Sequence, residues 1–389
     1  MTRPNKLARA ALTGLLAMGS PALAQAPTPA PAAAPSVPDS VVSPQVHPDR
    51  TVTFRVYAPK ATDVTLTGDW MATPTMATRT GGTVKMVRGD NGVWSYTSTP
   101  LEATTHLYFF NIDGLNIADP VNPVSKSRSR TTGSLVEVPG TPTPLWQLQP
   151  VPRGSVALNW QHSNVYNDEH QFAVYLPPGY DKGTQKYPVL YLVHGGGDVF
   201  ISWTTAGNAN IILDNLIAQK KAVPMIIVMP FLGRDYPTTP APSGTAGFED
   251  YMTRELIPYV DGHYRTLTDR KNRAMAGLSA GGGATFNVGL KHTELFSQFG
   301  FFSAGETAAA GAIDRYPMFA SAEAAKGKFD LFWMSYGDED PNSVPTRAFD
   351  AALTKNGIKH TYVTRPGGHV WPVWRWSLAE FAPLLFRNK

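Results

Sequence analysis

One serine stands among glycines in the stretch M-A-G-L-S-A-G-G-G, residues 275–283. Gly277-Leu278-Ser279-Ala280-Gly281 fits the pattern G-x-S-x-G, which is typical of a nucleophile elbow, a sharp strand–turn–helix that exposes a serine hydroxyl. Glycines flank such a serine because a Cβ would clash with the bent backbone. The alternative is a capping serine at a glycine-rich helix start. The apolar run before the motif favours Ser279 as a nucleophile.

A serine hydroxyl attacks only when a base removes its proton. In the architecture that carries this elbow, the partners follow along the chain in the order serine, acid, histidine. His369, in P-G-G-H-V-W, comes just after the last strand that the sequence predicts, at 360–365. The other histidines lie earlier in the chain, inside strands or near helix ends. We therefore expect His369 to be the base.

The acid should follow the strand that precedes the histidine. Y-G-D-E-D-P (336–341) ends a strand predicted over 329–336, so Asp338, Glu339 and Asp340 all qualify by position. An ionised carboxylate there would fix the imidazole tautomer and stabilise the imidazolium. Spacing alone does not choose among them, although we favour Asp340 over Asp338. A spare carboxylate in this cluster would cap a loop or a helix.

His194-Gly195-Gly196-Gly197 follows the strongest predicted strand, 187–193, and is similar to an HGGG-type oxyanion loop. We expect the Gly196 and Ala280 N–H groups to hold the carbonyl oxygen as it becomes an anion. One such donor contributes about 3–4 kcal/mol in the transition state. A plain glycine turn is the alternative.

Substrate contacts are expected from residues near these loops. We predict Gly197, Trp203 and Trp371 as substrate-binding residues, with core packing as an equal alternative for both tryptophans. For Trp374 the core interpretation is favoured.

Alternating strands and helices must position these groups. Beyond residue 155, further strands are predicted at 171–176, 224–229 and 272–277, and helices near 209–221, 248–261, 281–292, 344–356 and 375–386. The middle strands are apolar throughout, as buried parallel strands are. This alternation predicts a parallel sheet covered by helices on both faces. The fold class is therefore α/β, a three-layer α/β-hydrolase sandwich over residues 155–389.

Residues 46–140 predict a separate, small all-β immunoglobulin-like sandwich. Short strands are expected at 51–59, 63–70, 92–97 and 106–114, bounded by Asp-Asn-Gly, Asp-Gly and Pro. Its aromatic residues could stack on sugars, but strand aromatics mostly pack, so the core interpretation is favoured for Trp70, Trp94 and Tyr96. Residues 141–154 are Pro-rich and predict a linker.

The N-terminus resembles a secretory signal peptide rather than part of a fold. Arg3, Lys6 and Arg9 precede a mostly apolar run that ends in Ala22-Leu23-Ala24, which predicts cleavage after residue 24. The run is shorter than the roughly 20 residues that span a bilayer. Residues 25–45 are rich in Pro and Ala and predict an extended tether. We expect a secreted or periplasmic protein with no membrane contact after cleavage.

Composition excludes several other functions. The chain of 389 residues has a net charge of +4, and losing the three basic residues of the leader leaves 31 Lys and Arg against 30 Asp and Glu. No basic stripe suggests nucleic acid. There is no cysteine, which excludes disulfides, thiolate catalysis and Cys-type zinc sites.

Several motifs together resemble the catalytic domain of carbohydrate esterase family 1, over about residues 155–387. They are H-G-G-G-D (194–198), the stretch 203–218, R-A-M-A-G-L-S-A-G-G-G (273–283), G-D-E-D (337–340) and P-G-G-H-V-W-P-V-W-R (366–375). That family includes feruloyl esterases and acetyl xylan esterases, and the enterochelin esterases are related to it. V-H-P-D-R-T-V-T-F-R-V-Y-A-P through D-P-V-N-P is similar to the family 48 carbohydrate-binding sandwich.

The resemblance implies roles residue by residue. The family nucleophile falls on Ser279, its histidine on His369 and its acid on Asp340, the last residue of G-x-x-D. The family often has Met after the serine, where this chain has Ala280. Residues 231–245 match no family pattern, so the resemblance says least about the identity of the substrate.

The implied function is a secreted serine esterase that releases feruloyl or acetyl groups from a plant polysaccharide such as xylan, through a Ser-His-Asp acyl-enzyme. No metal or organic cofactor is required, and the partner is an esterified polysaccharide or oligosaccharide. One alternative is a ferric-siderophore trilactone esterase, for which Arg234 and Arg375 are the only obvious cations. Another is a noncatalytic carbohydrate-binding surface protein. The sequence leaves the acyl group and the oligomeric state open.

Overall fold

The computed structural model describes residues 38, 40–71, 82–129, 131–233, 245–305 and 311–387. The predicted signal peptide and most of the predicted tether lie outside the described residues, and so does Arg234. None of the helices in the described ranges has the length and apolar character that crossing a membrane requires.

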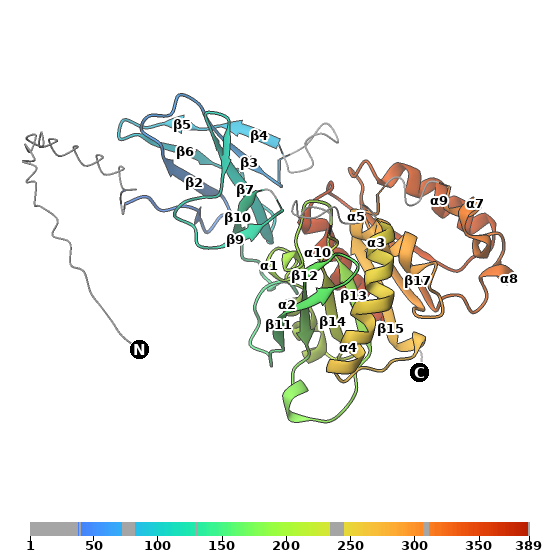
Figure 1. Ribbon diagram of the computed structural model, residues 1–389. Coiled ribbons are helices and arrows are strands. Elements are labelled where there is room, and N and C mark those ends of the chain that lie inside the picture. Colours follow the sequence, from blue (N-terminus) through green and yellow to red (C-terminus); the bar gives the residue numbers. More distant parts are fainter. Residues whose placement is uncertain are drawn as a thin grey trace, which may run out of the picture. The chain divides into compact units, whose positions relative to one another are not determined.

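Two antiparallel sheets build the N-terminal domain (Figure 1). The first has the order β1-β2-β6-β5, and the second β4-β3-β7-β10-β9 with β8 paired to β7. Their bounds are β1 Gln45–Val46, β2 Val52–Tyr57, β3 Val64–Gly68, β4 Gly82–Lys85, β5 Val87–Arg88, β6 Val93–Thr97, β7 Thr105–Ile112, β8 Leu115–Ile117, β9 Ser125–Ser127 and β10 Thr132–Glu137.

Apolar side chains from both sheets fill the space between them, as alternation along half-buried strands requires. Val52, Phe54, Leu66 and Phe110 are fully buried there. Trp94 belongs to this core, and its indole N–H donates to the Ala58 carbonyl at 3.0 Å. The core interpretation of that tryptophan is therefore correct.

The chain joins this domain earlier than the predicted tether allows. Val41 and Ser43 are buried, and the Ser43 hydroxyl donates to Asp119 at 2.6 Å. Gln45 pairs with Thr53 as part of β1. Residues 41–45 therefore belong to this domain, because the Ser43 hydrogen bond and the pairing of β1 with β2 hold a stretch whose composition predicted a free tether.

An eight-stranded sheet forms the C-terminal domain, in the order β11-β12-β14-β13-β15-β16-β17-β18 (Figure 1). Strands β11 and β12 are antiparallel, β12 is antiparallel to β14, and the remaining pairs are parallel. The bounds are β11 Ser155–Ser163, β12 Asp168–Leu176, β13 Val189–Val193, β14 Ile226–Pro230, β15 Arg273–Leu278, β16 Gln298–Phe302, β17 Leu331–Gly337 and β18 Thr361–Arg365.

Helices cover both faces of this sheet, and the two cores share its strands. On β13, Val189, Tyr191 and Val193 face one core, while Leu190 and Leu192 face the other. The helical segments are α1 Ser202–Thr205, α2 Ala209–Ala218, α3 Thr245–Asp250, α4 Ile257–His263, α5 Ala280–Ala284, α7 Ala312–Arg315, α8 Ala322–Ala325, α9 Ser343–Lys355 and α10 Trp371–Phe381. The predicted fold class is confirmed.

Some elements differ from the sequence prediction. The predicted helix at 248–261 is α3 and α4 joined by a π-helical turn, Tyr251–Leu256, and a second such turn, Thr285–Gly289, follows α5. The last helix begins at Trp371 rather than 375, because Pro372 suits the first turn of a helix. Strands β11 and β16 were not predicted.

Contacts join the two domains, and they include those of a buried arginine. Arg375 of α10 is fully buried, donates to the carbonyls of Ala206 and Thr105, and reaches the Thr104 hydroxyl at 3.0 Å. Burial lowers the pKa of Arg375 to about 10, although Asp69 and Glu102 oppose that shift.

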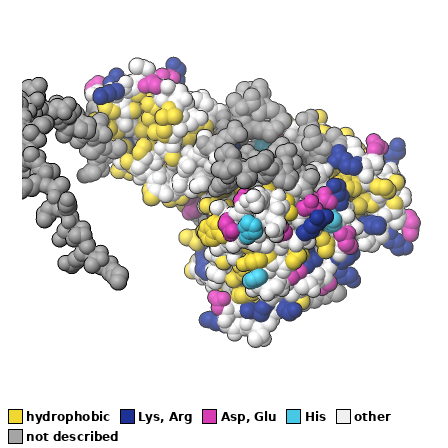
Figure 2. All heavy atoms as spheres, in the orientation of Figure 1, with side chains coloured by type: hydrophobic (Ala, Val, Ile, Leu, Met, Phe, Trp, Pro, Cys, Tyr) yellow, Lys and Arg dark blue, Asp and Glu magenta, His cyan; other side chains and the backbone are white. Residues whose placement is uncertain are grey.

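On the face drawn in Figure 2, the basic and acidic side chains of the described residues are interspersed.

Candidate active site

Ser279 directly follows β15 and has a strained backbone conformation. Its φ is 51° and its ψ is −114°, and it leads directly into α5. A Cβ on Gly281 would overlap the carbonyl oxygens of Val193 and His194, and a Cβ on Gly277 would overlap the Gly281 backbone. The two glycines of G-x-S-x-G are therefore required by the close approach of strand and helix, as a nucleophile elbow demands.

His369 and Asp340 form the second half of the site. The His369 Nδ1 donates to the Asp340 Oδ2 at 2.9 Å, and the carboxylate is 1% exposed. Burial by itself raises the pKa of Asp340. The hydrogen bond and charge of His369, together with Ser303 and the Asn342 amide, outweigh burial, so the pKa lies below its usual value. An ionised Asp340 holds the imidazole with its Nε2 lone pair free.

Asp338 performs a different task. It is exposed, and its Oδ1 accepts a hydrogen bond from the Gly367 amide at 3.0 Å. A Cβ on Gly337 would overlap the Gly367 carbonyl, so this glycine lets β17 approach the loop closely. Asp338 thus fastens the loop that carries His369, whereas Asp340 contacts the ring itself.

The predicted oxyanion loop, residues 194–197, is held by its own histidine. The His194 Nε2 accepts from the Leu232 amide at 3.1 Å, so its Nδ1 carries the proton and donates to the Gly195 carbonyl at 2.8 Å. The Asp198 amide donates to the same carbonyl at 3.2 Å. Because the peptide between Gly195 and Gly196 is planar and trans, the Gly196 N–H points away from the direction of the Gly195 carbonyl. It donates to none of the described residues.

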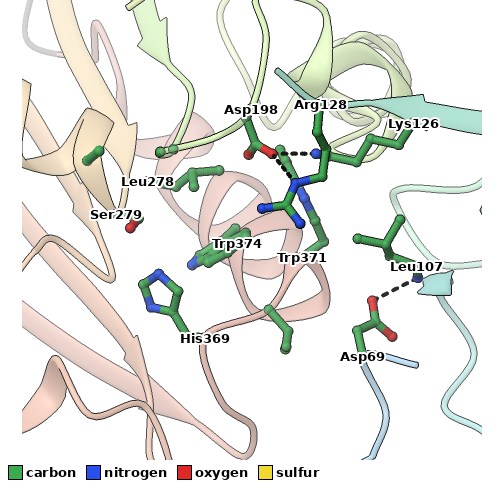
Figure 3. Close-up of a pocket in the computed structure, with 14 residues that line it drawn as sticks. Asp69, Leu107, Lys126, Arg128, Asp198, Leu278, Ser279, His369, Trp371 and Trp374 are labelled. Atoms are coloured by element: carbon green, nitrogen blue, oxygen red, sulfur yellow. Dashed lines mark hydrogen bonds and ion pairs between the residues drawn. The ribbon is translucent and has the colours of Figure 1, made fainter. Parts of the chain in front are cut away.

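A cavity of about 190 Å³ opens onto Ser279. Ser279 and His369 lie on one side of it, and the sandwich residues Lys126 and Arg128 lie on the other (Figure 3). Its lining residues are Asp69, Leu107, Lys126, Arg128, Gly195, Gly196, Asp198, Leu278, Ser279, Ala280, His369, Val370, Trp371 and Trp374.

The structure thus brings the predicted catalytic and oxyanion residues to one cavity, with Asp340 behind His369. Of the predicted substrate contacts, Trp371 lines the cavity. Trp374, for which core packing was favoured, also lines it and meets the His369 ring edge-on with centroids 5.0 Å apart.

Two residues predicted as substrate contacts do not line this cavity. Trp203 is fully buried, and its indole N–H donates to the Val193 carbonyl at 3.1 Å, so it supports the wall behind Trp371. Gly197 does not line the cavity, because its carbonyl turns to the sandwich domain and accepts from the Ser129 amide at 3.1 Å.

Sequence reasoning missed four cavity residues with charged side chains. Asp198 follows the glycines of the oxyanion loop directly, and that position was its only signal. Lys126, Arg128 and Asp69 come from the sandwich domain. No local sequence pattern indicates that residues of one domain line the cavity of another.

Comparison with known families supports both domains. Residues 163–385 match the family model described as "Putative esterase", and residues 42–124 match carbohydrate-binding module 48, the isoamylase N-terminal domain. The chain is 35% identical over 270 residues to an endo-1,4-beta-xylanase/feruloyl esterase of Xylanibacter ruminicola. That match covers 67% of this chain and 36% of the relative, so the chain spans about a third of its length.

Solved structures agree. A ferulic acid esterase is 28% identical with a TM-score of 0.55, and the match covers 60% of this chain and 98% of that one. An enterobactin esterase from Shigella flexneri has a TM-score of 0.61 over 87% of this chain and 93% of its own, but at 18% identity it shows the fold alone. The predicted carboxylic ester hydrolase class and the predicted family resemblance are confirmed. The chain belongs to the family whose model is described as "Putative esterase".

Proposed function

We propose that this protein is a secreted serine esterase that removes feruloyl groups from a plant cell-wall polysaccharide such as xylan. The supporting observation is the cavity at Ser279, which Trp371 and Trp374 line. An aromatic acyl group matches such walls in size and polarity, because ring faces and edges pack favourably on one another. An acetyl group would leave most of the cavity empty.

In the proposed reaction, His369 takes the proton of Ser279 as the hydroxyl oxygen attacks the ester carbonyl. The N–H groups of Gly196 and Ala280 hold the oxyanion of the tetrahedral intermediate. The C–O bond to the alcohol then breaks, and the leaving oxygen receives the proton from His369. Water, deprotonated by the same histidine, attacks the acyl-enzyme, releases the acid and restores Ser279.

A second cavity offers room for the sugar side of the ester. It measures about 420 Å³ and is lined by sandwich residues such as Trp70 and Glu102 together with residues of the His369 loop. Asp69 and Val370 line both cavities, so the two adjoin. We assign the polysaccharide chain to this second cavity.

The relatives support this substrate class, since the curated relative and the ferulic acid esterase both carry ferulic ester activity in their names. Secretion is proposed from the basic and apolar character of residues 1–24. For a siderophore trilactone, Arg375 was one of two supporting cations, but it is buried in domain contacts rather than placed at the cavity mouth. A noncatalytic role leaves the Ser279, His369 and Asp340 arrangement without a purpose.

The test compares hydrolysis of methyl ferulate, acetylated xylan and a catecholate trilactone by the full chain. We expect the highest kcat/KM on methyl ferulate and no turnover by Ser279→Ala, with an unchanged far-UV circular dichroism spectrum. A preference for acetylated xylan or the trilactone would replace the proposed substrate. Wild-type rates in Ser279→Ala would end the proposal.

A further inference from the structure

The sandwich domain places a buried cation in the wall of the catalytic cavity. Lys126, in the middle of β9, is 1% exposed, and its ammonium group donates to the Asp198 Oδ1. The ammonium nitrogen also lies 5.4 Å from the ring centre of Trp371. All three residues line the cavity that holds Ser279 (Figure 3).

Asp198 directly follows the oxyanion loop. Its amide donates to the Gly195 carbonyl, the same group that fixes the direction of the Gly196 N–H. Its carboxylate is nearly buried, since the residue is 6% exposed. A negative charge therefore lies next to the loop that must stabilise another negative charge on the substrate.

That carboxylate would oppose the reaction if it stood alone. Charge develops on the carbonyl oxygen in the transition state, and repulsion between like charges is stronger in a site that excludes water. Lys126 supplies the opposite charge by direct contact, and the Arg128 Nε lies 4.0 Å from the same oxygen. Burial lowers the pKa of Lys126, while the adjacent Asp198 favours its charged form.

The oxyanion loop also has a second attachment to the sandwich domain that does not involve Lys126. The Ser129 amide donates to the Gly197 carbonyl at 3.1 Å. Removing the lysine charge thus leaves the loop tied at Gly197 and by His194, which separates an electrostatic effect from loss of the loop.

We propose that Lys126 of the sandwich domain is a positioning residue for ester hydrolysis, which acts by neutralising Asp198 beside the oxyanion hole. The sandwich domain then contributes to the chemical step itself, even on a small soluble ester with no carbohydrate. This inference rests on the proposed esterase reaction at Ser279.

The test measures kcat and KM of the full chain on 1-naphthyl acetate, which carries no sugar. We expect Lys126→Met to lower kcat at least tenfold, or about 1.4 kcal/mol, with KM changed less than threefold. Asp198→Asn should lose less kcat, because it removes the negative charge that opposes the developing oxyanion. The double variant should recover most of the kcat that Lys126→Met loses.

Lys85→Met is the matched control, since Lys85 is a sandwich lysine whose side chain is 84% exposed. A wild-type kcat in Lys126→Met would overturn the proposal, as would a double variant no faster than Lys126→Met. If Lys126→Met does not fold, the comparison of Asp198→Asn with the double variant decides. The kcat of Asp198→Asn and that of the double variant should then both stay within fivefold of the wild-type kcat. A larger loss of kcat in the double variant overturns the proposal. Absence of wild-type activity on every ester would instead defeat the esterase function.

Discussion

Two aspartates two residues apart contact different groups, which makes them a natural pair for mutation. Asp340 is buried against the His369 ring, whereas Asp338 is exposed and holds the Gly367 amide. Asp340→Asn should lower kcat by about 10⁴, because the amide stabilises the wrong imidazole tautomer.

Asp338→Asn is the matched control. An asparagine oxygen can still accept from Gly367, so kcat should stay within a few-fold of wild type. Steady-state kinetics of both variants on one ester measures this difference. Equal losses would mean that the two carboxylates share the catalytic role.

How much of the site the sequence predicts depends on how local each signal is. Ser279 and its glycines form one short motif, and His369 follows from chain order. Trp203 and Trp371 look alike in sequence, but only the second reaches the cavity, because tertiary packing decides which ring has a free surface. Lys126 carries no local signal, since its partner lies 72 residues away in another domain.

At the level of elements, the apolar strands β13, β14 and β15 were predicted, whereas β11 and the mostly apolar β16 were not. Strand β11 alternates exposed and half-buried residues at the edge of the sheet, so its signal is weak. The π-helical turns keep a helical pattern of side chains, and the sequence therefore predicts helix there without showing the wider turn.

His292 lies between two glutamates, one of them on α3, and should make stability depend on pH. Its Nε2 contacts Glu249 of α3 at 3.0 Å, and its Nδ1 contacts Glu294 at 2.7 Å. Burial opposes charging, but the two hydrogen bonds prevail and raise the pKa of His292 above 6.5. Its stabilising contribution is therefore complete below pH 6.5 and is lost as the pH rises through the higher folded-state value.

We expect the melting temperature of wild type to fall between pH 6 and pH 9 more than that of His292→Gln. Thermal unfolding at a series of pH values measures this, and other titrating groups cancel in the comparison. His162→Gln, which changes an imidazole whose side chain is 58% exposed, is the control. Parallel curves for wild type and His292→Gln would contradict the prediction.

For the whole molecule, Arg375 is one buried polar connection between the domains. Arg375→Met would leave the carbonyls of Ala206 and Thr105 and the Thr104 hydroxyl without this donor. Because unsatisfied buried acceptors cost free energy, we expect the free energy of unfolding to fall by about 2–4 kcal/mol.

Urea denaturation followed by tryptophan fluorescence measures that loss, and a transition that separates into two steps would show the domains unfolding independently. Arg254→Met, at a side chain 75% exposed, should leave the midpoint unchanged. An unchanged midpoint in Arg375→Met would show that the hydrogen bonds of this arginine contribute little to the stability of the chain.

The segment at 141–154, expected to be a linker, lies against the esterase domain rather than free in solvent. The Asn215 side chain donates to the carbonyls of Leu145 and Gln147 at 2.7 Å and 2.9 Å, and that of Asn208 donates to the Trp146 carbonyl at 3.0 Å. A protease needs an extended, accessible backbone, so the peptide bonds of this segment should resist digestion. Fragments cut at this Pro-rich stretch to obtain the hydrolase alone would leave Asn215 of helix α2, and Asn208 just before that helix, without these acceptors.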